Sequence, residues 1–187
     1  ESLYNRATQR AEDGQYDDAI ELYQQLGDFK DSRERIADIQ AHFYSTILSA
    51  TNGFLIVIKD NKFGFIDETG NLVVSCEWEN TIGYFYDGFA LVQKDGKYGF
   101  IDTTGTLVVP CEWEVAGFFS DGLAYVMKNL KYGFIDTTGK LVIPCEWEDV
   151  QDFSDGLALV QKDGKWGYID ETGTLVVPCE WENAESF

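Results

Sequence analysis

The sequence is poor in the residues and motifs on which most enzymes depend. It has one histidine, His42, among 187 residues. It contains no Gly-x-Ser-x-Gly nucleophile motif, no phosphate-binding glycine-rich loop and no dinucleotide-binding fingerprint. A single histidine in a helical segment is more typical of a helix face than of a catalytic centre. We therefore expect no catalytic activity and no bound cofactor.

Positive charge and long apolar segments are also scarce. Lysine and arginine number 14 against 33 aspartates and glutamates, which gives a net charge of −19. Such an acidic chain repels nucleic acid and anionic membranes, so neither is an expected partner. No apolar run approaches the roughly 20 residues that a membrane helix needs, and no signal peptide is visible. Hydrophobic residues make up 44% of the chain, enough for a globular core.

The cysteines have the pattern of neither a disulfide framework nor a zinc site. Cys76, Cys111, Cys145 and Cys179 lie at one equivalent position of a repeated segment, and no Cys-x-x-Cys occurs. We expect each to be a small buried apolar residue with a free thiol. Unpaired thiols favour a reducing compartment such as the cytoplasm, although a cell-surface location stays open.

What the sequence has in abundance is a repeat of 34 residues. The segment from Asp87 to Asp102 returns at Asp121 and at Asp155, and each copy closes with Cys-Glu-Trp-Glu. A more divergent copy begins at Asn52. Repetition at a period of roughly 20–50 residues indicates an array in which each copy completes its core against its neighbours. The sequence thus divides into a segment 1–51 and four repeats, 52–86, 87–120, 121–154 and 155–187.

Each repeat carries the signals of three short antiparallel strands. In the second repeat these are residues 91–94, a two-residue Asp95-Gly96 turn, residues 97–102, a turn from Asp102 to Gly105, and residues 106–109 before Pro110. Three strands in 34 residues are fewer than the four strands and roughly 40 residues of a propeller blade. We therefore predict a mainly β fold, an open, solenoid-like array of four three-stranded antiparallel β units with an N-terminal helical cap.

The side-chain alternation predicts that the sheets are covered on both faces. Tyr98 and Phe100 point to one face, and Gly99 and Ile101 point to the other. A sheet that is apolar on both faces must be covered on both, which favours stacked sheets. The glycine is expected to let a neighbouring aromatic ring lie over the strand. Four aromatic columns are expected to form core ladders: Phe63, Tyr98, Tyr132 and Trp166; Phe65, Phe100, Phe134 and Tyr168; Trp78, Trp113, Trp147 and Trp181; Phe85, Phe119, Phe153 and Phe187.

Residues 1–51 carry helical signals instead. Leu3, Ala7 and Ala11 recur at a spacing of four, and a second helix is expected with Asp17 as its cap. Asp31-x-x-Glu34 has the pattern of a capping box that opens a third helix, with Ile36, Ile39, Phe43 and Ile47 on one face. The pattern Gly14-x-Tyr16-x-x-Ala19-x-x-x-Tyr23-x-x-Leu26 resembles the second half of a tetratricopeptide (TPR) unit, without its usual closing proline.

The repeats resemble a known family at specific residues. Lys165-Trp166-Gly167-Tyr168-Ile169-Asp170-x-x-Gly173, followed by Leu175-Val176-Val177-Pro178, is similar to the WG repeat of bacteria, which is built of short antiparallel β-hairpins. The resemblance extends over residues 52–187. The name-giving tryptophan is replaced in three copies by Phe63, Tyr98 and Tyr132. The resemblance implies an interaction or architectural module and supplies no catalytic residue.

The repeated acids are the candidate functional residues. Asp102 with Glu112 and Glu114 offers oxygen ligands for calcium, but no calcium-loop motif accompanies them, so no metal site is expected. We instead expect a protein-interaction scaffold whose acidic surface binds a protein partner that carries a basic patch. Its candidate residues are Glu112, Glu114, Glu146, Glu148, Glu180 and Glu182.

Two further expectations follow from the repeats. A bacterial surface carbohydrate-binding or cell-wall-binding module is the alternative function, because Gly164-Lys165-Trp166-Gly167-Tyr168 is similar to the aromatic repeats of cell-wall-binding proteins. Those repeats are shorter and present exposed rings, which favours the scaffold. Phe187 aligns with Phe153 and Phe119, each followed by a further repeat, so the natural chain is expected to continue.

Overall fold

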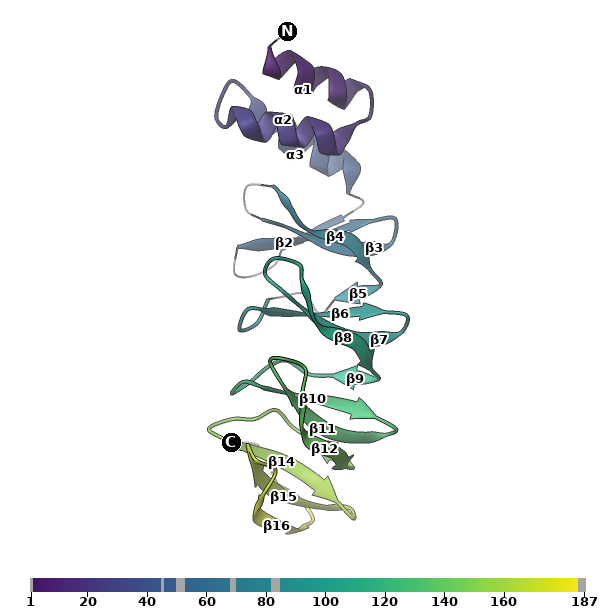
Figure 1. Ribbon diagram of the computed structural model, residues 1–187, viewed down its shortest axis with the longest axis vertical. Helices are drawn as coiled ribbons and strands as arrows, with labels where there is room; N and C mark the ends of the chain where they lie inside the picture. The colour runs from purple at the N-terminus through teal and green to yellow at the C-terminus, as the bar shows by residue number, and fades with distance from the viewer. Residues whose placement is uncertain (1, 45, 50–52, 68–69, 82–84, 185–187) are drawn as a thin grey trace. The chain divides into compact units, whose positions relative to one another are not determined.

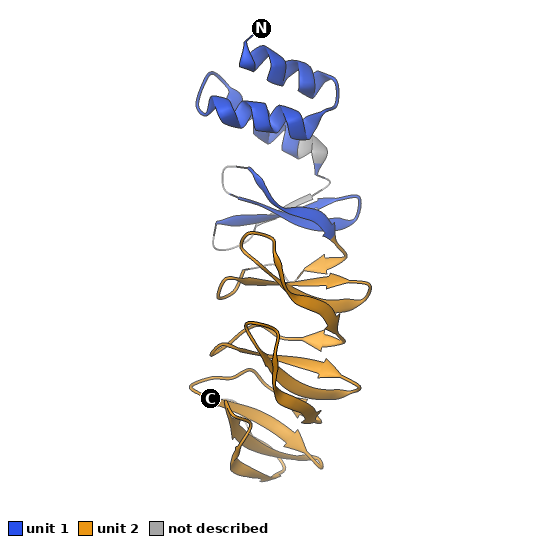
Figure 2. Ribbon diagram, in the orientation of Figure 1, with its two compact units in different colours: residues 1–77 blue, residues 78–187 orange. Residues whose placement is uncertain are grey.

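The structure, a computed structural model, forms two compact units. It describes the chain except for residues 1, 45, 50–52, 68–69, 82–84 and 185–187 (Figure 1). Unit 1 comprises residues 1–77 and unit 2 comprises residues 78–187 (Figure 2). The predicted boundary at residues 51 and 52 lies outside the described residues, as does Phe187.

Unit 1 begins with the three predicted helices. They are α1 (Leu3–Glu12), α2 (Tyr16–Leu26) and α3 (Ser32–Phe43). Gly14 and Gly27 have φ values of 74° and 56°, a left-handed conformation that glycine adopts without strain and that ends each of the first two helices. The helices share a core of small and branched apolar residues around one tyrosine: Ala7, Ala19, Ile20, Tyr23, Ile36 and Ile39.

Three details of this helical segment differ from the predictions. Helix α2 begins at Tyr16 after Gln15, so Asp17 is not its cap and lies in its first turn, where a negative charge suits the helix dipole. The capping box is wrong, because the Asp31 side chain makes no cap hydrogen bond. It accepts instead from the hydroxyl of Tyr4 and, at 3.0 Å, from Nε of Arg35.

The third difference is the end of α3, which stops at Phe43. Ile47, expected on the helix face, lies in strand β1 (Thr46–Ser49). The first sheet has the order β1-β2-β3-β4, with β2 (Phe54–Lys59), β3 (Lys62–Asp67) and β4 (Leu72–Trp78). The amide of Gln40 in α3 donates to the carbonyl oxygen of Gly70 beside this sheet. Helices and first sheet thus belong to one unit.

Unit 2 holds three further four-stranded antiparallel sheets. Their strands are β5 (Asn80–Thr81), β6 (Phe89–Lys94), β7 (Lys97–Asp102) and β8 (Leu107–Trp113); β9 (Val115–Ala116), β10 (Leu123–Lys128), β11 (Lys131–Asp136) and β12 (Leu141–Trp147); and β13 (Asp149–Val150), β14 (Leu157–Lys162), β15 (Lys165–Asp170) and β16 (Leu175–Trp181). Every strand pairing of the described residues lies inside one sheet, and none closes a barrel. The prediction of a mainly β fold with N-terminal helices is confirmed.

Each sheet of unit 2 adds one short strand to the three expected. The short strand belongs to the preceding repeat: Val115 and Ala116 directly follow the second repeat's Cys-Glu-Trp-Glu segment. They pair with Met127 and Val126 of the third repeat. Each sheet therefore contains two residues of the repeat before it, which links neighbouring repeats through backbone hydrogen bonds.

The sheets of unit 2 are also covered by one another, as the alternation predicted. Phe100, Val109 and Trp113 of the second repeat pack in one cluster with Val126 and Ile135 of the third. An equivalent cluster joins the third repeat to the fourth. Burying one such side chain completely contributes about 1.5–3 kcal/mol. The core of unit 2 therefore lies mainly between repeats.

The repeated glycine has a different role from the one expected. A Cβ on Gly99 would lie 2.5 Å from the carbonyl oxygen of Val109 and 2.8 Å from the amide nitrogen of Cys111, so strand backbone rather than a ring fills that space. The cause is a β-bulge, because β8 advances four positions from Val109 to Trp113 where β7 advances two from Phe100 to Tyr98. Pro110 lies in this bulge, where its missing N–H costs no ladder bond.

The predicted turns are confirmed. Asp102 Oδ1 accepts from the backbone nitrogens of Thr104 at 2.9 Å and of Thr106 at 3.0 Å. Asp95 and Gly96 have φ values of 52° and 70°, as a two-residue hairpin turn requires. The divergent Asn129-Leu130 turn has the same positive φ values, 55° and 60°.

Candidate interaction surface

The candidate glutamates flank the tryptophan at the end of each repeat's last long strand. Glu112 and Glu114 lie on either side of Trp113, at the end of β8. The Trp is buried, and the two glutamates are partly or fully exposed beside it. The equivalent pairs are Glu146 with Glu148 and Glu180 with Glu182.

The second glutamate of each pair contacts a lysine of its own repeat. The Lys97 Nζ to Glu114 Oε1 distance is 3.5 Å. The equivalent distances are 3.5 Å between Lys131 and Glu148 and 3.1 Å between Lys165 and Glu182. These lysines begin the strand that follows the hairpin turn, and the glutamates follow the next strand. Each ion pair therefore connects two neighbouring strands at one end of the same sheet.

The first glutamate contacts a lysine of the following repeat. Glu112 lies 3.6 Å from Lys128 Nζ, and Glu146 lies 3.8 Å from Lys162 Nζ. Glu180 is exposed, and in the part of the chain that the structure describes it has no ion pair. The glutamates of this column therefore connect consecutive repeats.

The same lysines cover the buried tryptophans. Lys128 Nζ lies 5.4 Å from the ring centroid of Trp113, and Lys162 Nζ lies 5.4 Å from that of Trp147. The two rings are 4% and 2% exposed. Such a cation–π contact contributes about 0.5–1 kcal/mol at an exposed site. Each lysine thus joins a ring and a carboxylate of the preceding repeat.

Glu148 also contacts the hairpin turn of the next repeat. Its Oε2 accepts from the backbone nitrogen of Gly164 at 2.9 Å, and Glu79 accepts in the same way from Gly96 at 3.1 Å. The Gly164 hydrogen bond, with the nearby charge of Lys131, holds the pKa of Glu148 below its ordinary value. The Glu-Trp-Glu segments therefore join repeats, and five of the six candidate glutamates face a lysine.

The lysines are concentrated at this side of the repeats. Residues 52–187 contain no arginine, and all their lysines except Lys140 flank a hairpin turn. Because the glutamate pairs lie beside these turns, their negative charge is largely balanced there. Exposed pairs of this kind contribute only about 0–1 kcal/mol each.

The larger excess of acids lies at the other end of the strands, because the hairpin turns add only one aspartate each, at Asp60, Asp95 and Asp163. Asp87 and Gly88 form a tight turn that brings Tyr86 opposite Phe89. Asp102 ends β7 directly beside this turn, because it pairs with Phe89. The strand between this turn and the hairpin turn spans about 20 Å. We call the aspartates of this end the aspartate edge: Asp87, Asp121, Asp155, Asp102, Asp136 and Asp170.

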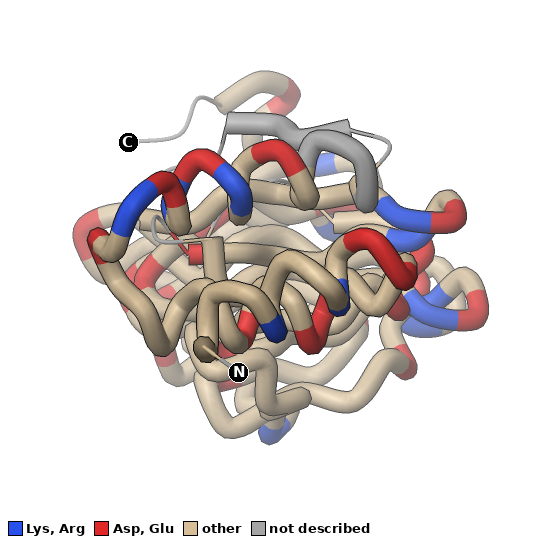
Figure 3. Tube along the Cα trace, turned by 90° about the horizontal axis from the view of Figure 1, so that it is seen from above, with Lys and Arg blue, Asp and Glu red and all other residues tan. Residues whose placement is uncertain are grey.

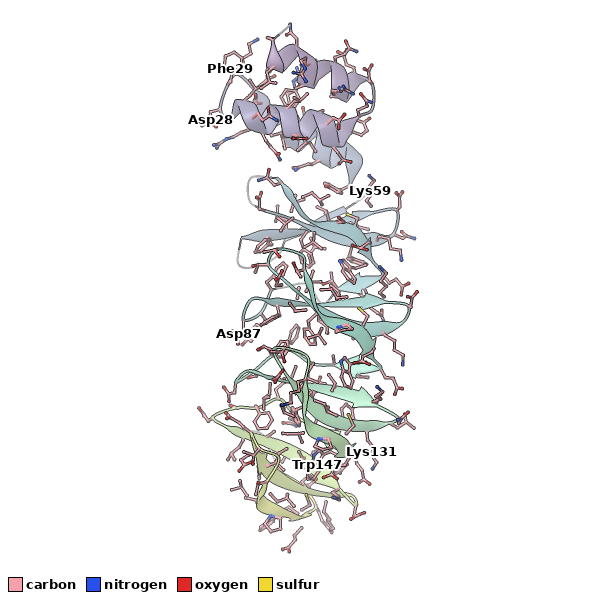
Figure 4. The ribbon with its side chains drawn as sticks, viewed as in Figure 1. Asp28, Phe29, Lys59, Asp87, Lys131 and Trp147 are labelled. Atoms are coloured by element: carbon pink, nitrogen blue, oxygen red, sulfur yellow. The ribbon has the colours of Figure 1, made fainter. Side chains whose placement is uncertain are left out.

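Asp87 lies at one side of unit 2, and Lys131 lies at the other (Figure 4). Acidic residues predominate along the trace (Figure 3). The aspartate edge was missed from the sequence, although the placement of nearly all lysines beside the hairpin turns was a visible signal for it.

The remaining candidate residues are the cysteines and His42. All four cysteines are free and partly buried, and burial raises the pKa of each thiol, which keeps it protonated at neutral pH. His42 lies in α3. The described residues contain no group of three or more His, Cys, Asp or Glu side chains arranged to hold a metal. Among the helices described, none has the length and apolar character needed to cross a membrane.

Comparisons with known proteins identify the repeat. A family model described as "WG containing repeat" matches residues 63–98, 98–132, 132–166 and 166–187. Each match begins at a residue of the first aromatic column, which consists of Phe63, Tyr98, Tyr132 and Trp166. A search of the curated proteins found no match.

Solved structures give only distant likenesses. A eukaryotic initiation factor has 13% identity and a TM-score of 0.48, with 71% of this chain and 42% of that chain covered. Kluyveromyces lactis Hsv2p has 12% identity and a TM-score of 0.42, with 71% and 50% covered. The extracellular domain of a hybrid two-component system from B. thetaiotaomicron has 13% identity and a TM-score of 0.41, with 72% and 22% covered. The chain spans half or less of these structures, and we draw no conclusion from them.

Proposed function

The chain belongs to the WG-containing repeat family, and we propose that it is a non-catalytic scaffold that binds a protein partner through its acidic surface. The observation that carries this proposal is the separation of charge within the repeats. The glutamate pairs face lysines, whereas the aspartate edge combines two acids per repeat with few bases. The partner that fits this edge carries a basic patch.

Hydrogen bonds favour the charged form of three of these aspartates. The pKa of Asp102, Asp136 and Asp170 lies below the ordinary value, chiefly because the hydroxyl of Thr104, Thr138 or Thr172 donates to the carboxylate. Asp121 Oδ2 accepts from the backbone nitrogen of Gly156 at 3.0 Å, which fixes one carboxylate across a repeat boundary. Fixed charges of one sign increase the rate at which an oppositely charged protein associates.

The three helices have a separate role in the proposal. We infer that they are a TPR-like segment that covers the first sheet in unit 1. The hydrogen bond from Gln40 to Gly70 supports this role. So does a cavity of about 470 Å³ whose lining includes Ile36 of α3 and Leu55 and Ile66 of the first sheet.

The carbohydrate-binding alternative has less support. It needs exposed aromatic rings, and Trp78, Trp113 and Trp147 are at most 4% exposed. Trp181, at 58% exposed, is the exception among the four equivalents. Retention of the protein on a glycan or cell-wall column is therefore an outcome that the test of the scaffold has to include.

A pull-down from the source cell at low and high salt tests the scaffold. The test variant is Asp87→Asn/Asp121→Asn/Asp155→Asn, because asparagine tolerates the positive φ of these turns. The matched control is Glu112→Gln/Glu146→Gln/Glu180→Gln, which removes the same number of charges at the lysine-rich side. We expect a partner that is lost at high salt and with the aspartate variant but is kept by the glutamate variant. Recovery of no protein at either salt, with retention on a glycan column, would refute the proposal.

A further inference from the structure

A polar cavity lies between the start of the third repeat's sheet, at Ser120 and Tyr125, and the segment 150–154 that leads from β13 into the fourth repeat. Its volume is about 440 Å³, within the range of about 300–1,000 Å³ that is typical of small-molecule sites. Its polar lining comes from Ser120, Tyr125, Gln151, Asp152 and Ser154, and Phe153 contributes to its apolar part. No lysine or arginine lines it.

The cavity exists because this boundary has lost two aromatic rings. At the preceding boundary, the residues equivalent to Ser120 and Asp152 are Tyr86 and Phe118, whose ring centroids lie 5.9 Å apart. Those rings fill the space that Ser120 and Asp152 leave open. The boundary also has Gln151 in place of Gly117 and Tyr125 in place of Leu91. The cavity therefore follows from substitutions that the preceding boundary does not share.

Asp152 is the chemically distinctive group of the cavity. Among the described residues, no cation and no hydrogen-bond donor pairs with its carboxylate. Asp152 is exposed at the mouth of the cavity, and the part of its carboxylate that the protein covers loses water, which raises the pKa of Asp152 above its ordinary value. Burial raises the pKa of Tyr125, and the negative charge of Asp152 raises it further. Because no cation of the described residues pairs with the Asp152 carboxylate, a bound cation would gain a charge-assisted hydrogen bond there.

We propose that this cavity binds an organic cation, an alkylammonium or guanidinium group that pairs with Asp152 and lies against the ring of Tyr125. The hydroxyl oxygens of Ser120, Ser154 and Tyr125 and the amide oxygen of Gln151 are acceptors for the remaining N–H bonds. A neutral sugar would leave the carboxylate unpaired. A calcium ion needs about six to eight oxygen ligands, usually with several carboxylates, and this lining has one.

The test is a titration of the full 187-residue chain followed by amide NMR. The probes are agmatine and cadaverine as free cations, and N-acetyl-lysine and N-acetyl-arginine methylamides as peptide-like cations. We expect saturable shifts centred on residues 151–154, and about tenfold or greater weakening in Asp152→Asn through loss of the charged hydrogen bond. Asp163→Asn is the matched control, because it removes one charge at an exposed hairpin turn whose positive φ asparagine tolerates.

A second variant keeps the test independent of the charge change. Ser120→Tyr/Asp152→Phe restores the ring pair of the preceding boundary, so it is expected to fold and to abolish binding. Stronger binding of the two methylamides than of the free diamines assigns the site to a peptide side chain, and the reverse assigns it to a small cation. Equal binding to Asp152→Asn and wild type, or no saturable shift with any probe at about 10 mM, would overturn the proposal. Neither result depends on the pull-down, so this site and the scaffold can fail separately.

Discussion

The same four residues, Cys-Glu-Trp-Glu, occur in two environments within unit 2. In β12, Trp147 is 2% exposed and packs with Val150, Phe153 and Val160 of the boundary that follows. In β16, the equivalent Trp181 is 58% exposed. The two strands have nearly the same sequence, so the difference comes from the neighbouring repeat. Burial of the tryptophan is a property of the boundary between repeats.

The comparison separates two kinds of stabilising feature. The tryptophan, its lysine and the branched residues around it act between repeats, as in other arrays in which nearest-neighbour terms dominate. The glycine at the bulge and the aspartate turn act inside one repeat and are the same in the third and fourth copies. Substitution of a residue that acts between repeats should therefore change the free energy of unfolding very differently in the third and fourth repeats. Substitution of a residue that acts inside one repeat should change it by about the same amount in both.

The largest difference is expected for the tryptophans. Trp147→Ala removes a large ring from a closed core and should lower the free energy of unfolding by about 3–5 kcal/mol. Trp181→Ala removes an exposed ring and should change it by less than about 0.5 kcal/mol. Chemical denaturation of both variants measures this difference. Equal losses would show that the tryptophan stabilises its own repeat and not the boundary.

The bulge glycines are expected to behave alike. A Cβ on Gly133 would lie 2.4 Å from the carbonyl oxygen of Ile143, and a Cβ on Gly167 would lie 2.5 Å from that of Val177. Backbone has to move in both cases, so Gly133→Ala and Gly167→Ala should each cost about 1–3 kcal/mol. The check is the same denaturation experiment. If Gly133→Ala lowered the free energy of unfolding and Gly167→Ala did not, the close contact at this glycine would depend on the neighbouring repeat.

The features that act inside a repeat are also those that the sequence predicts best. The Asp95-Gly96 hairpin and the turn at Asp102 depend on residues within a few positions of one another, and both were found. The short strand Val115–Ala116 was not, because two residues show no periodicity and their partners lie in the next repeat. The position of Ile47 in the apolar pattern is compatible with a helix or with a strand, and in the structure it lies in a strand.

Contacts between repeats limited the prediction of the site. The six glutamates were correctly seen as a repeated set, but their lysine partners lie on separate strands, and two of them on the following repeat. An alignment of the repeats shows the substitutions that open the cavity. It does not show that the substituted residues are neighbours, because Ser120 and Asp152 are nearly a whole repeat apart in the sequence and meet only after the sheets stack.

A smaller effect is expected for the lysines. Lys162 lies over Trp147 and 3.8 Å from Glu146, whereas Lys165 contacts Glu182, whose side chain is 83% exposed. Lys162→Met should cost about 0.5–1 kcal/mol, and Lys165→Met should cost less. Denaturation at low and high salt measures both, and added salt should reduce the Glu146 part of the loss. A larger cost for Lys165→Met would contradict the assignment of Lys162 to the boundary.

The smallest effect is the pH dependence of the aspartate turns. The hydroxyl of Thr138 holds the pKa of Asp136 below its ordinary value, and that of Thr172 does the same for Asp170. Each carboxylate binds a proton less readily in the folded chain than in the unfolded chain. Its stabilisation is therefore complete above the unfolded pKa of about 3.9 and is lost as the pH falls through the folded value.

Asp136→Asn and Asp170→Asn should each lower the denaturation midpoint at neutral pH, and the difference from wild type should shrink towards acid. The backbone bonds to Thr138 and Thr172 are both 2.9 Å, so the two pH profiles should coincide at high salt, where the charge of Lys140 that further lowers the pKa of Asp136 is screened. A difference between the two variants that remains at high salt would show that even this turn depends on the neighbouring repeat.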